Sequence, residues 1–181
     1  MKRAVVFLAN GSEEVETVTP VDYLRRAGID VTVAGIGERD LIGSRGIRMT
    51  ADLAVDDIEG EFDCVVIPGG GAGSKAIAGD VHAEKLITSH FAAGKLTAAI
   101  CAAPAVVLGR AYGLLSGRNF TCYPGLEKED YGGKFQDSRV VVDGNLITAR
   151  AAGCAGEFAY AIIKALLGRD AADRVAAQVL L

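Results

Sequence analysis

Short apolar runs rich in β-branched residues alternate with segments of helical periodicity, and this alternation constrains the fold more than any other feature. The runs lie at residues 3–9, 30–36, 63–68 and 96–100. Strands that are apolar on both faces and separated by helices indicate a parallel sheet covered on both sides. The sequence therefore predicts an α/β three-layer sandwich of flavodoxin-like type, with any site at the carboxyl ends of the strands.

Helix termini are predicted at several positions. Thr19 followed by Pro20 is typical of a helix start, because threonine caps the first turn and proline fits the first helical position. Two arginines followed by Ala27-Gly28 are typical of a helix end, which favours cations and then glycine. These signals predict a helix over residues 19–28, and similar signals predict another over residues 80–93.

Antiparallel pairs are predicted in one short insertion and in the last third of the chain. Residues 39–50 contain glycines and alternating side chains, which predict a small hairpin. Asp143-Gly144, between two apolar runs, is a strong hairpin signal, so the last part of the sheet is expected to turn antiparallel. Two helices, at about residues 154–167 and 171–179, would follow. Without a linker or repeat, we predict one domain over residues 1–181.

Composition excludes several classes of function. The net charge is −4 and the pI about 5.2, so no basic surplus exists to neutralise phosphates, and we expect no stable nucleic-acid binding. No apolar run approaches the ~18–20 residues that span a bilayer, and the apolar part of the first run, Ala4 to Ala9, is only six residues long, below the ~7–15 residues of a secretory signal. We therefore expect a cytoplasmic protein with free thiols at its four cysteines and no membrane contact.

The glycine run PGGGAGSKA at residues 68–76 follows a strand and precedes a helix. It fails the P-loop and dinucleotide fingerprints, because Ser74 and Ala76 occupy places that these motifs reserve for other residues. The run is either a plain strand-to-helix turn or a set of backbone N–H groups open to a small anion. His82 and His90 have no partner at zinc spacing. We expect neither a cofactor nor a metal.

Cys101 stands where the apolar run 96–100 gives way to a helix. A strand, a nucleophile and a helix in this order form a nucleophile elbow, here with Ala99 and Ala103 in place of the usual flanking glycines. The helix N-terminus would lower the pKa of the thiol, and the amides of Ala102 and Ala103 could stabilise an oxyanion. The alternative is a buried and inert cysteine.

The acidic cluster GSEEVE at residues 11–16 is the best source of a proton acceptor for Cys101, because it follows the first strand at the same edge of the sheet. Glu16, which has apolar neighbours, is the candidate for an inward carboxyl with a raised pKa. Glu13 and Glu14 are interpreted as solvated acids at a helix start, where negative charge is favourable.

The other three cysteines are interpreted mainly as structural. Cys64 lies inside an apolar strand and is predicted to belong to the core. Cys154 stands at a helix start, and nothing else in the sequence supports its reactivity. Cys122 and its neighbour Tyr123 could line the same cavity as Cys101.

Several segments of the chain, taken together, are specific to one family. They are LANGSEEVE (8–16), PVDYLRRAGIDVTVAG (20–35), GSRG (43–46), DCVVIPGG (63–70), the residues around Cys101 (98–108), YPGLE (123–127) and the tail from ITARAAG (147–153) onward. With them the chain resembles the ThiJ/PfpI superfamily, and within it the DJ-one branch of parkinsonism-associated protein deglycases. The resemblance covers nearly the whole chain and implies a single domain of the class I glutamine amidotransferase-like type.

The resemblance also implies roles for particular residues. The family's reactive cysteine corresponds to Cys101 and its glutamate to Glu16, the residue already chosen for its apolar neighbours. The oxyanion donors of the family correspond to the backbone of Gly70 and Ala102. In the protease-like branch a histidine directly follows the cysteine. Because alanine follows it here, the resemblance disfavours peptidase activity.

Further residues are assigned to the pocket and to a dimer contact by the same resemblance. Tyr123, Gly69 and Arg45 would line the pocket, with Tyr123 standing where some members have a histidine. The family is typically homodimeric. The first helix, around residues 14–26, and the segment that carries Arg45 would form that contact, and Arg45 would also be able to reach the pocket of the partner subunit.

The function that this resemblance implies is that of a cofactor-free deglycase or glyoxalase. Its substrates would be methylglyoxal, glyoxal, or early glycation adducts of proteins and nucleotides, with Cys101 as nucleophile and Glu16 as proton carrier. The alternative is a redox-sensing, chaperone-like stress protein, in which Cys101 is oxidised and catalytic turnover is small. A third possibility is a relative that has lost activity.

Overall fold

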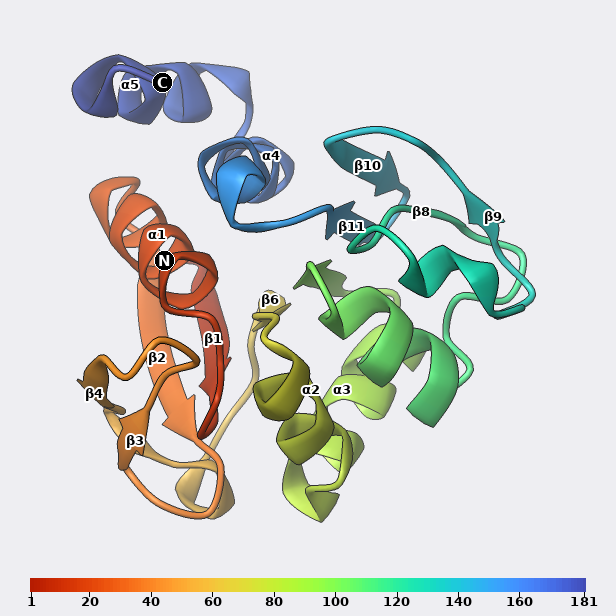
Figure 1. Cartoon of the computed structure of the whole chain (residues 1–181). Helices are drawn as coiled ribbons and strands as arrows, with labels where there is room; N and C mark the ends of the chain where they lie inside the picture. Colours follow the sequence, from red (N-terminus) through yellow and green to blue (C-terminus); the bar gives the residue numbers. More distant parts are fainter.

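The computed structural model describes residues 1–181, and its centre is a seven-stranded sheet (Figure 1). The strand order is β10-β11-β7-β6-β1-β2-β5. Six neighbouring strands are parallel and only β10 runs antiparallel to its neighbour. The strands are β1 (Arg3–Leu8), β2 (Asp30–Gly35), β5 (Leu53–Ala54), β6 (Cys64–Ile67), β7 (Leu96–Ile100), β10 (Val140–Asp143) and β11 (Leu146–Ala149).

Helices cover both faces of the sheet, as Figure 1 shows. One face carries α1 (Glu14–Arg26), α4 (Ala155–Leu167) and α5 (Arg169–Val179), and the other carries α2 (Gly71–Ala78), α3 (Val81–Ala92) and η2 (Pro104–Ala111), a helix with π-type hydrogen bonds. Each face has its own apolar core of about twenty buried residues. The predicted three-layer α/β sandwich with a mostly parallel sheet is therefore confirmed.

Two short strand pairs and three 3-10 turns lie outside the main sheet. β3 (Asp40–Ile42) and β4 (Arg48–Thr50) form the antiparallel hairpin predicted for residues 39–50. The turn at Asp143-Gly144 joins β10 to β11, which confirms the second predicted hairpin. The remaining segments are β8 (Asn119–Phe120), which pairs with β9 (Lys134–Phe135), and the 3-10 turns η1 (Val55–Asp57), η3 (Leu126–Lys128) and η4 (Ala152–Cys154). No helix has the combination of length and apolar character that spanning a bilayer requires.

The helix start predicted from Thr19 and Pro20 was wrong, whereas the range 14–26 that the family resemblance implied agrees with the structure. α1 begins at Glu14, and Pro20 lies inside it. The Glu13 carboxylate accepts a hydrogen bond from the backbone N–H of Glu16 at 2.8 Å and so caps the helix well before Thr19. Pro20 is buried and removes one intrahelical hydrogen bond, a loss that the extra first turn and its packing outweigh. The predicted end, at Ala27-Gly28, is confirmed.

Candidate active site

Cys101 follows the last residue of β7 and has a φ of 64°, a left-handed conformation that residues with a Cβ rarely adopt. Neighbouring segments hold its backbone on both sides. Its N–H donates to the carbonyl oxygen of Ala149 at 2.8 Å, and its own carbonyl oxygen accepts from the N–H of Tyr123 at 2.8 Å. Such a conformation costs about 1–3 kcal/mol and persists only where the surroundings enforce it, which is characteristic of functional sites.

The carboxyl group of Glu16 meets Cys101 beside Gly69. Glu16 is only 1% exposed, and its Oε2 accepts a hydrogen bond from the N–H of Gly69 at 3.0 Å. A Cβ added to Gly69 would overlap that Oε2 and would lie 2.5 Å from the Cβ of Cys101. Gly69 therefore has to be glycine, because any side chain would separate the two groups.

Burial raises the pKa of both groups. Loss of solvation raises the pKa of Glu16 to about 7. Hydrogen bonds with the Cys101 thiol and with the amides of Gly69 and Ala152 favour the charged form and lower this pKa, but by less. The pKa of Cys101 is raised to about 12, first by burial and then by the negative charge of Glu16. The amide of Ala102 at the helix N-terminus does lower the pKa of this thiol, as expected, but burial and the neighbouring carboxylate outweigh it, so the net shift is upward.

Two backbone amides face the sulfur of Cys101. Hydrogen bonds from the N–H groups of Gly70 and Ala102 oppose the rise in the pKa of Cys101, which means that both donors stabilise negative charge on that atom. Gly70 takes a φ of 85° to present its amide, and it caps α2, whose first residues belong to the glycine run. Of the two readings of that run, the arrangement matches backbone N–H groups open to a small anionic centre.

These groups open into a pocket of about 430 Å³. The predicted residues Cys101, Glu16, Gly70, Ala102, Tyr123 and Arg45 all line it. Gly69 lies behind the pocket wall, where it contacts Glu16 and Cys101. Arg45 lies at the pocket of its own chain and is the only positively charged side chain in the lining.

The structure corrects two expectations about residues near this pocket. Glu13 and Glu14 are not simply solvated acids, because Glu13 caps α1 and lines the pocket, while Glu14 is 5% exposed and accepts three hydrogen bonds from the turn after β3. Cys122 does not line the cavity. It is fully buried in one of the two apolar cores, where loss of solvation raises the pKa of its thiol to about 12.

Several lining residues escaped the sequence reasoning. They are Glu13, Ser44, Gly71, Leu126, Ala151 and Ala152. Ala151 and Ala152 follow β11 at the carboxyl edge of the sheet, so the general rule for parallel sheets could have located them. Ser44 had no such signal, because only the folding of the β3–β4 hairpin over α1 brings it to the pocket.

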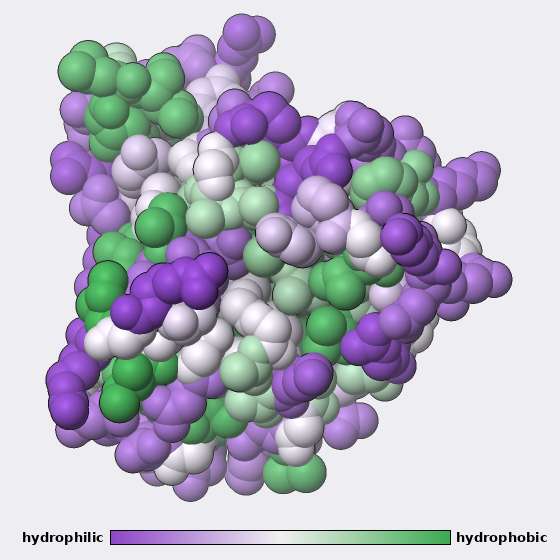
Figure 2. Space-filling view, viewed as in Figure 1, coloured by the Kyte–Doolittle hydropathy of each residue, from purple (hydrophilic) through white to green (hydrophobic).

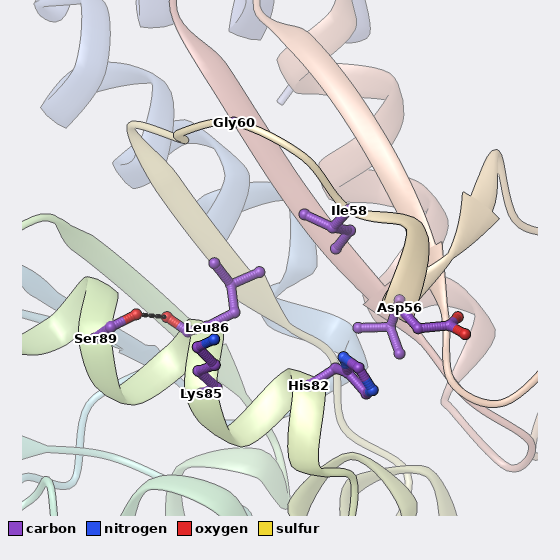
Figure 3. Close-up of a pocket in the computed structure, with 8 residues that line it drawn as sticks. Asp56, Ile58, Gly60, His82, Lys85, Leu86 and Ser89 are labelled. Carbon is purple, nitrogen blue, oxygen red and sulfur yellow. Dashed lines mark hydrogen bonds between the residues drawn. The ribbon is translucent and has the colours of Figure 1, made fainter.

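The two histidines lie away from Cys101. His90 is buried, and its Nε2 lies 2.9 Å from the carbonyl oxygen of Leu96. His82 lines a second, smaller cavity of about 220 Å³ between η1 and α3, where it points toward Asp56 (Figure 3). No cluster of three or more His, Cys, Asp or Glu side chains is placed to hold a metal ion. The four cysteines are free thiols, and Cys64 is fully buried in the core as predicted.

Known proteins match this chain closely. The model of the DJ-1/PfpI family matches residues 2–165. The protein dj-1beta of Drosophila melanogaster is 41% identical over 97% of this chain and 95% of its own length. The glutathione-independent glyoxalase DJR-1.2 of Caenorhabditis elegans is 34% identical over 93% of this chain and 91% of its own length.

A solved structure agrees with these matches. The crystal structure of a cysteine-to-alanine mutant of a DJ-1 superfamily protein from Salmonella typhimurium superposes with a TM-score of 0.95. It is 37% identical and covers 99% of this chain and 98% of that one. Both the family match and the structural match therefore extend through the strands and helices that build the pocket.

Proposed function

Because this chain belongs to the DJ-1/PfpI family, we propose that it is a cysteine-dependent, cofactor-independent glyoxalase or deglycase that acts on small reactive carbonyls. One observation carries the proposal: Cys101 is held in a left-handed turn, with the Glu16 carboxyl and the amides of Gly70 and Ala102 directed at its sulfur. A nucleophile, a proton carrier and two oxyanion donors are the groups that addition to a carbonyl requires.

Two further observations support the choice of substrate class. The pocket of about 430 Å³ accommodates a small molecule. A relative that is 34% identical over nearly the full length of both chains is named as a glutathione-independent glyoxalase. Methylglyoxal and glyoxal, which carry an aldehyde beside a second carbonyl, are therefore the substrates that we propose.

In the first step, the sulfur of Cys101 bonds to the aldehyde carbon while the carboxylate of Glu16 takes the thiol proton. The carbonyl electrons move to oxygen, where the amides of Gly70 and Ala102 stabilise the negative charge. Glu16 then returns the proton to that oxygen, and a hemithioacetal results. The raised pKa of Glu16, about 7, suits both proton transfers at neutral pH.

In the second step, Glu16 removes the hydrogen of the hemithioacetal carbon as a proton, the electron pair forms a double bond to the neighbouring carbon, and the oxygen of that carbon takes up the proton to give an enediol. The second carbon is then protonated while the hydroxyl group of the first carbon loses its proton and becomes the carbonyl group of a thioester. The first carbon is thereby oxidised and the second reduced, so the rearrangement to a thioester needs no external oxidant. Water then cleaves the thioester. Methylglyoxal yields lactate, glyoxal yields glycolate, and the Cys101 thiol is regenerated with its proton.

The same chemistry extends to early glycation adducts of protein amines or guanine. Attack by Cys101 on the carbon that bears the amine would displace the amine, with Glu16 supplying its proton, and the same hemithioacetal would form. Peptidase activity is disfavoured, because Ala102 offers no side chain that could act as a base next to the cysteine.

The test is the formation of lactate from methylglyoxal by the wild type and three variants. Cys101→Ala should lose at least about 10³-fold in kcat/KM, because the nucleophile is absent. Glu16→Ala should lose about 10²–10⁴-fold, the usual contribution of a positioned acid or base. Cys64→Ala, which removes a thiol from the core, is the matched control and should turn over normally when folded. Undiminished turnover in Cys101→Ala would overturn the proposal.

The pH dependence of kcat/KM offers an independent check. At low pH both Glu16 and Cys101 are protonated, whereas the reactive form of the pair carries only one proton. The loss of the other proton is governed by the raised pKa of Glu16. We expect kcat/KM to rise with pH through about 7 and to level off above it. In Glu16→Gln this rise should disappear. A wild-type profile that falls between pH 6 and 8 would contradict the assignment.

We also propose that two copies of the chain associate through α1 and the β3–β4 hairpin. Figure 2 shows hydrophobic surface on this side of the molecule, and Val15, Val18, Ile42 and Ile47 are large apolar residues that remain exposed there. Apolar side chains gathered on one face are typical of an interaction site. Sedimentation of the wild type and of Val18→Asp tests this, with a shift toward monomer expected only in the variant.

A redox-sensing role for the same cysteine is a second candidate. The observation that favours it is the position of a protonatable carboxyl and two amide donors around one sulfur, because these groups would also stabilise a sulfinate. Intact mass after mild peroxide treatment distinguishes the two functions. Addition of two oxygens at Cys101 together with negligible carbonyl turnover would favour sensing over catalysis.

A further inference from the structure

Glu14 is a buried carboxyl that the proposed chemistry does not use. It is the first residue of α1 and is 5% exposed, although an acid at this position would be expected to face solvent. Burial by itself would raise the pKa of Glu14, but hydrogen bonds hold the pKa below its ordinary value. The side chain is therefore a buried carboxylate that is fixed by its donors.

All three donors belong to the turn between β3 and β4. Oε1 of Glu14 accepts from the N–H of Arg45 at 2.7 Å and from the N–H of Ile47 at 3.4 Å. Oε2 accepts from the hydroxyl of Ser44 at 3.1 Å. A charged acceptor makes stronger hydrogen bonds than a neutral one, so this carboxylate determines where the turn lies.

The same turn forms one wall of the pocket of Cys101. Ser44 and Arg45 are lining residues, and the N–H of Ser44 also donates to the carbonyl oxygen of Ser12 at 2.8 Å. Gly43 packs directly on the carboxyl group, since a Cβ at Gly43 would overlap it and would lie 2.6 Å from the Cγ of Glu14. The carboxylate of Glu14 therefore holds this wall, together with the backbone contact between Ser44 and Ser12.

We infer that Glu14 is a positioning residue that holds Ser44 and Arg45 against the pocket and thereby determines how the only cation of the pocket faces an incoming ligand. Glu14 touches neither Cys101 nor the substrate in this account. The inference rests on the proposed function only in that the ligand is a small electrophile attacked by Cys101. It adds that ligand charge and pocket entry are controlled from the β3–β4 turn.

The experiment compares alkylation of Cys101 by neutral iodoacetamide and by anionic iodoacetate, followed by mass spectrometry. Because the two reagents differ in charge, the ratio of their rates reports the electrostatic potential at the pocket entrance. The measurement does not depend on any catalytic turnover of methylglyoxal. Removing the cation in Arg45→Ala should lower the iodoacetate-to-iodoacetamide ratio by about fivefold, the size expected for one partly screened charge contact. Glu14→Ala should lower the ratio similarly, although Arg45 is still present.

Two further variants keep the test decisive if Glu14→Ala folds poorly. Gly43→Ala keeps the carboxylate but inserts a methyl group into its place, so it should lower the ratio as Glu14→Ala does. Glu14→Gln keeps one oxygen for the Arg45 and Ile47 amides, and its NH₂ can donate to Ser44, so the ratio should stay within about twofold of wild type. Glu59→Ala removes an exposed acid before β6 and is the control.

Turnover of methylglyoxal provides a second readout. Glu14→Ala should raise KM several-fold with little change in kcat, because the wall positions substrate and the reacting groups remain in place. A wild-type ratio in Glu14→Ala or in folded Gly43→Ala overturns the inference. If the wild type shows no turnover while the alkylation ratios change as expected, the proposed function fails and the positioning role of Glu14 stands.

Discussion

Two neighbouring strand-to-helix turns face each other at the carboxyl edge of the sheet, and they reach the same backbone conformation with different residues. The turn from β6 to α2 has Gly70 at a φ of 85°, and the turn from β7 to η2 has Cys101 at a φ of 64°. Glycine adopts positive φ freely, whereas a residue with a Cβ does so at a cost of about 1–2 kcal/mol. The first turn is therefore relaxed and the second is strained.

The difference shows which turn needs a side chain. At the β6–α2 turn only a backbone N–H is used, and a Cβ on Gly70 would overlap the carbonyl oxygen of Gly11. At the β7–η2 turn the sulfur itself is required, so glycine cannot replace it without loss of the chemistry. The other non-glycine residue with positive φ, Leu180, ends α5 and is 92% exposed, as is common at helix C-termini.

The largest stability effect should come from Gly70→Ala. The added Cβ would overlap the Gly11 carbonyl oxygen and lie 2.8 Å from the N of Glu13, both rigid backbone atoms, and the positive φ adds strain. We expect a loss of about 3 kcal/mol or more in the free energy of unfolding, measured with urea and circular dichroism.

Gly71→Ala is the matched control, since a Cβ there meets nothing within 4 Å. Gly71 is the first residue of α2, so alanine should instead stabilise the protein by up to about 1 kcal/mol. Equal effects of the two substitutions would mean that the conformation of the β6–α2 turn is not specifically required.

The fold was largely predictable because its signals are local. The apolar runs predicted the strands that alternate with helices, and Asp143-Gly144 predicted the antiparallel end of the sheet. The start of α1 was not predictable from Thr19 and Pro20, because the cap that Glu13 supplies depends on a side-chain hydrogen bond that the residue type does not favour strongly.

The residues of the candidate site were predictable from the sequence, but the pKa of Cys101 and the burial of Glu14 were not. Edge-of-sheet reasoning and the family motifs brought together Cys101, Glu16 and Gly70, which do line one pocket. The net rise in the thiol pKa was not predicted because burial depends on how tightly both sides of the pocket close. The burial of Glu14 was missed for the same reason, since its donors come from a hairpin about thirty residues away in the chain.

Glu16 lies between the two turns, and its charge should make the stability of the protein depend on pH. Its folded pKa of about 7 is raised from 4.5, so the stability linked to its protonated form is fully present below about pH 4.5 and is lost as pH rises through about 7. Glu16→Gln cannot ionise. Its free energy of unfolding should therefore rise relative to wild type by on the order of 2–3 kcal/mol between pH 4.5 and 8.

Urea unfolding of both proteins at several pH values measures this difference. Glu59→Gln, at an exposed position, is the control and should show no comparable trend. A constant difference between Glu16→Gln and wild type across this range would mean that the carboxyl is ionised as easily in the folded as in the unfolded protein. The carboxyl could not then act as a proton carrier with a pKa near 7, as the proposed chemistry requires.

The smallest effect concerns the strain at Cys101 itself and compares Cys101→Gly with Cys101→Ala. Alanine keeps the Cβ and the strain, whereas glycine relieves about 1–2 kcal/mol of strain and loses about 0.4–1 kcal/mol through the greater freedom of the unfolded chain. Cys101→Gly should therefore be more stable than Cys101→Ala by about 0.5–1 kcal/mol, the reverse of the order in an ordinary helix. If Cys101→Ala is the more stable variant, the β7–η2 turn stores no strain at this residue. The two turns would then differ only in the side chain that they carry, and not in backbone strain.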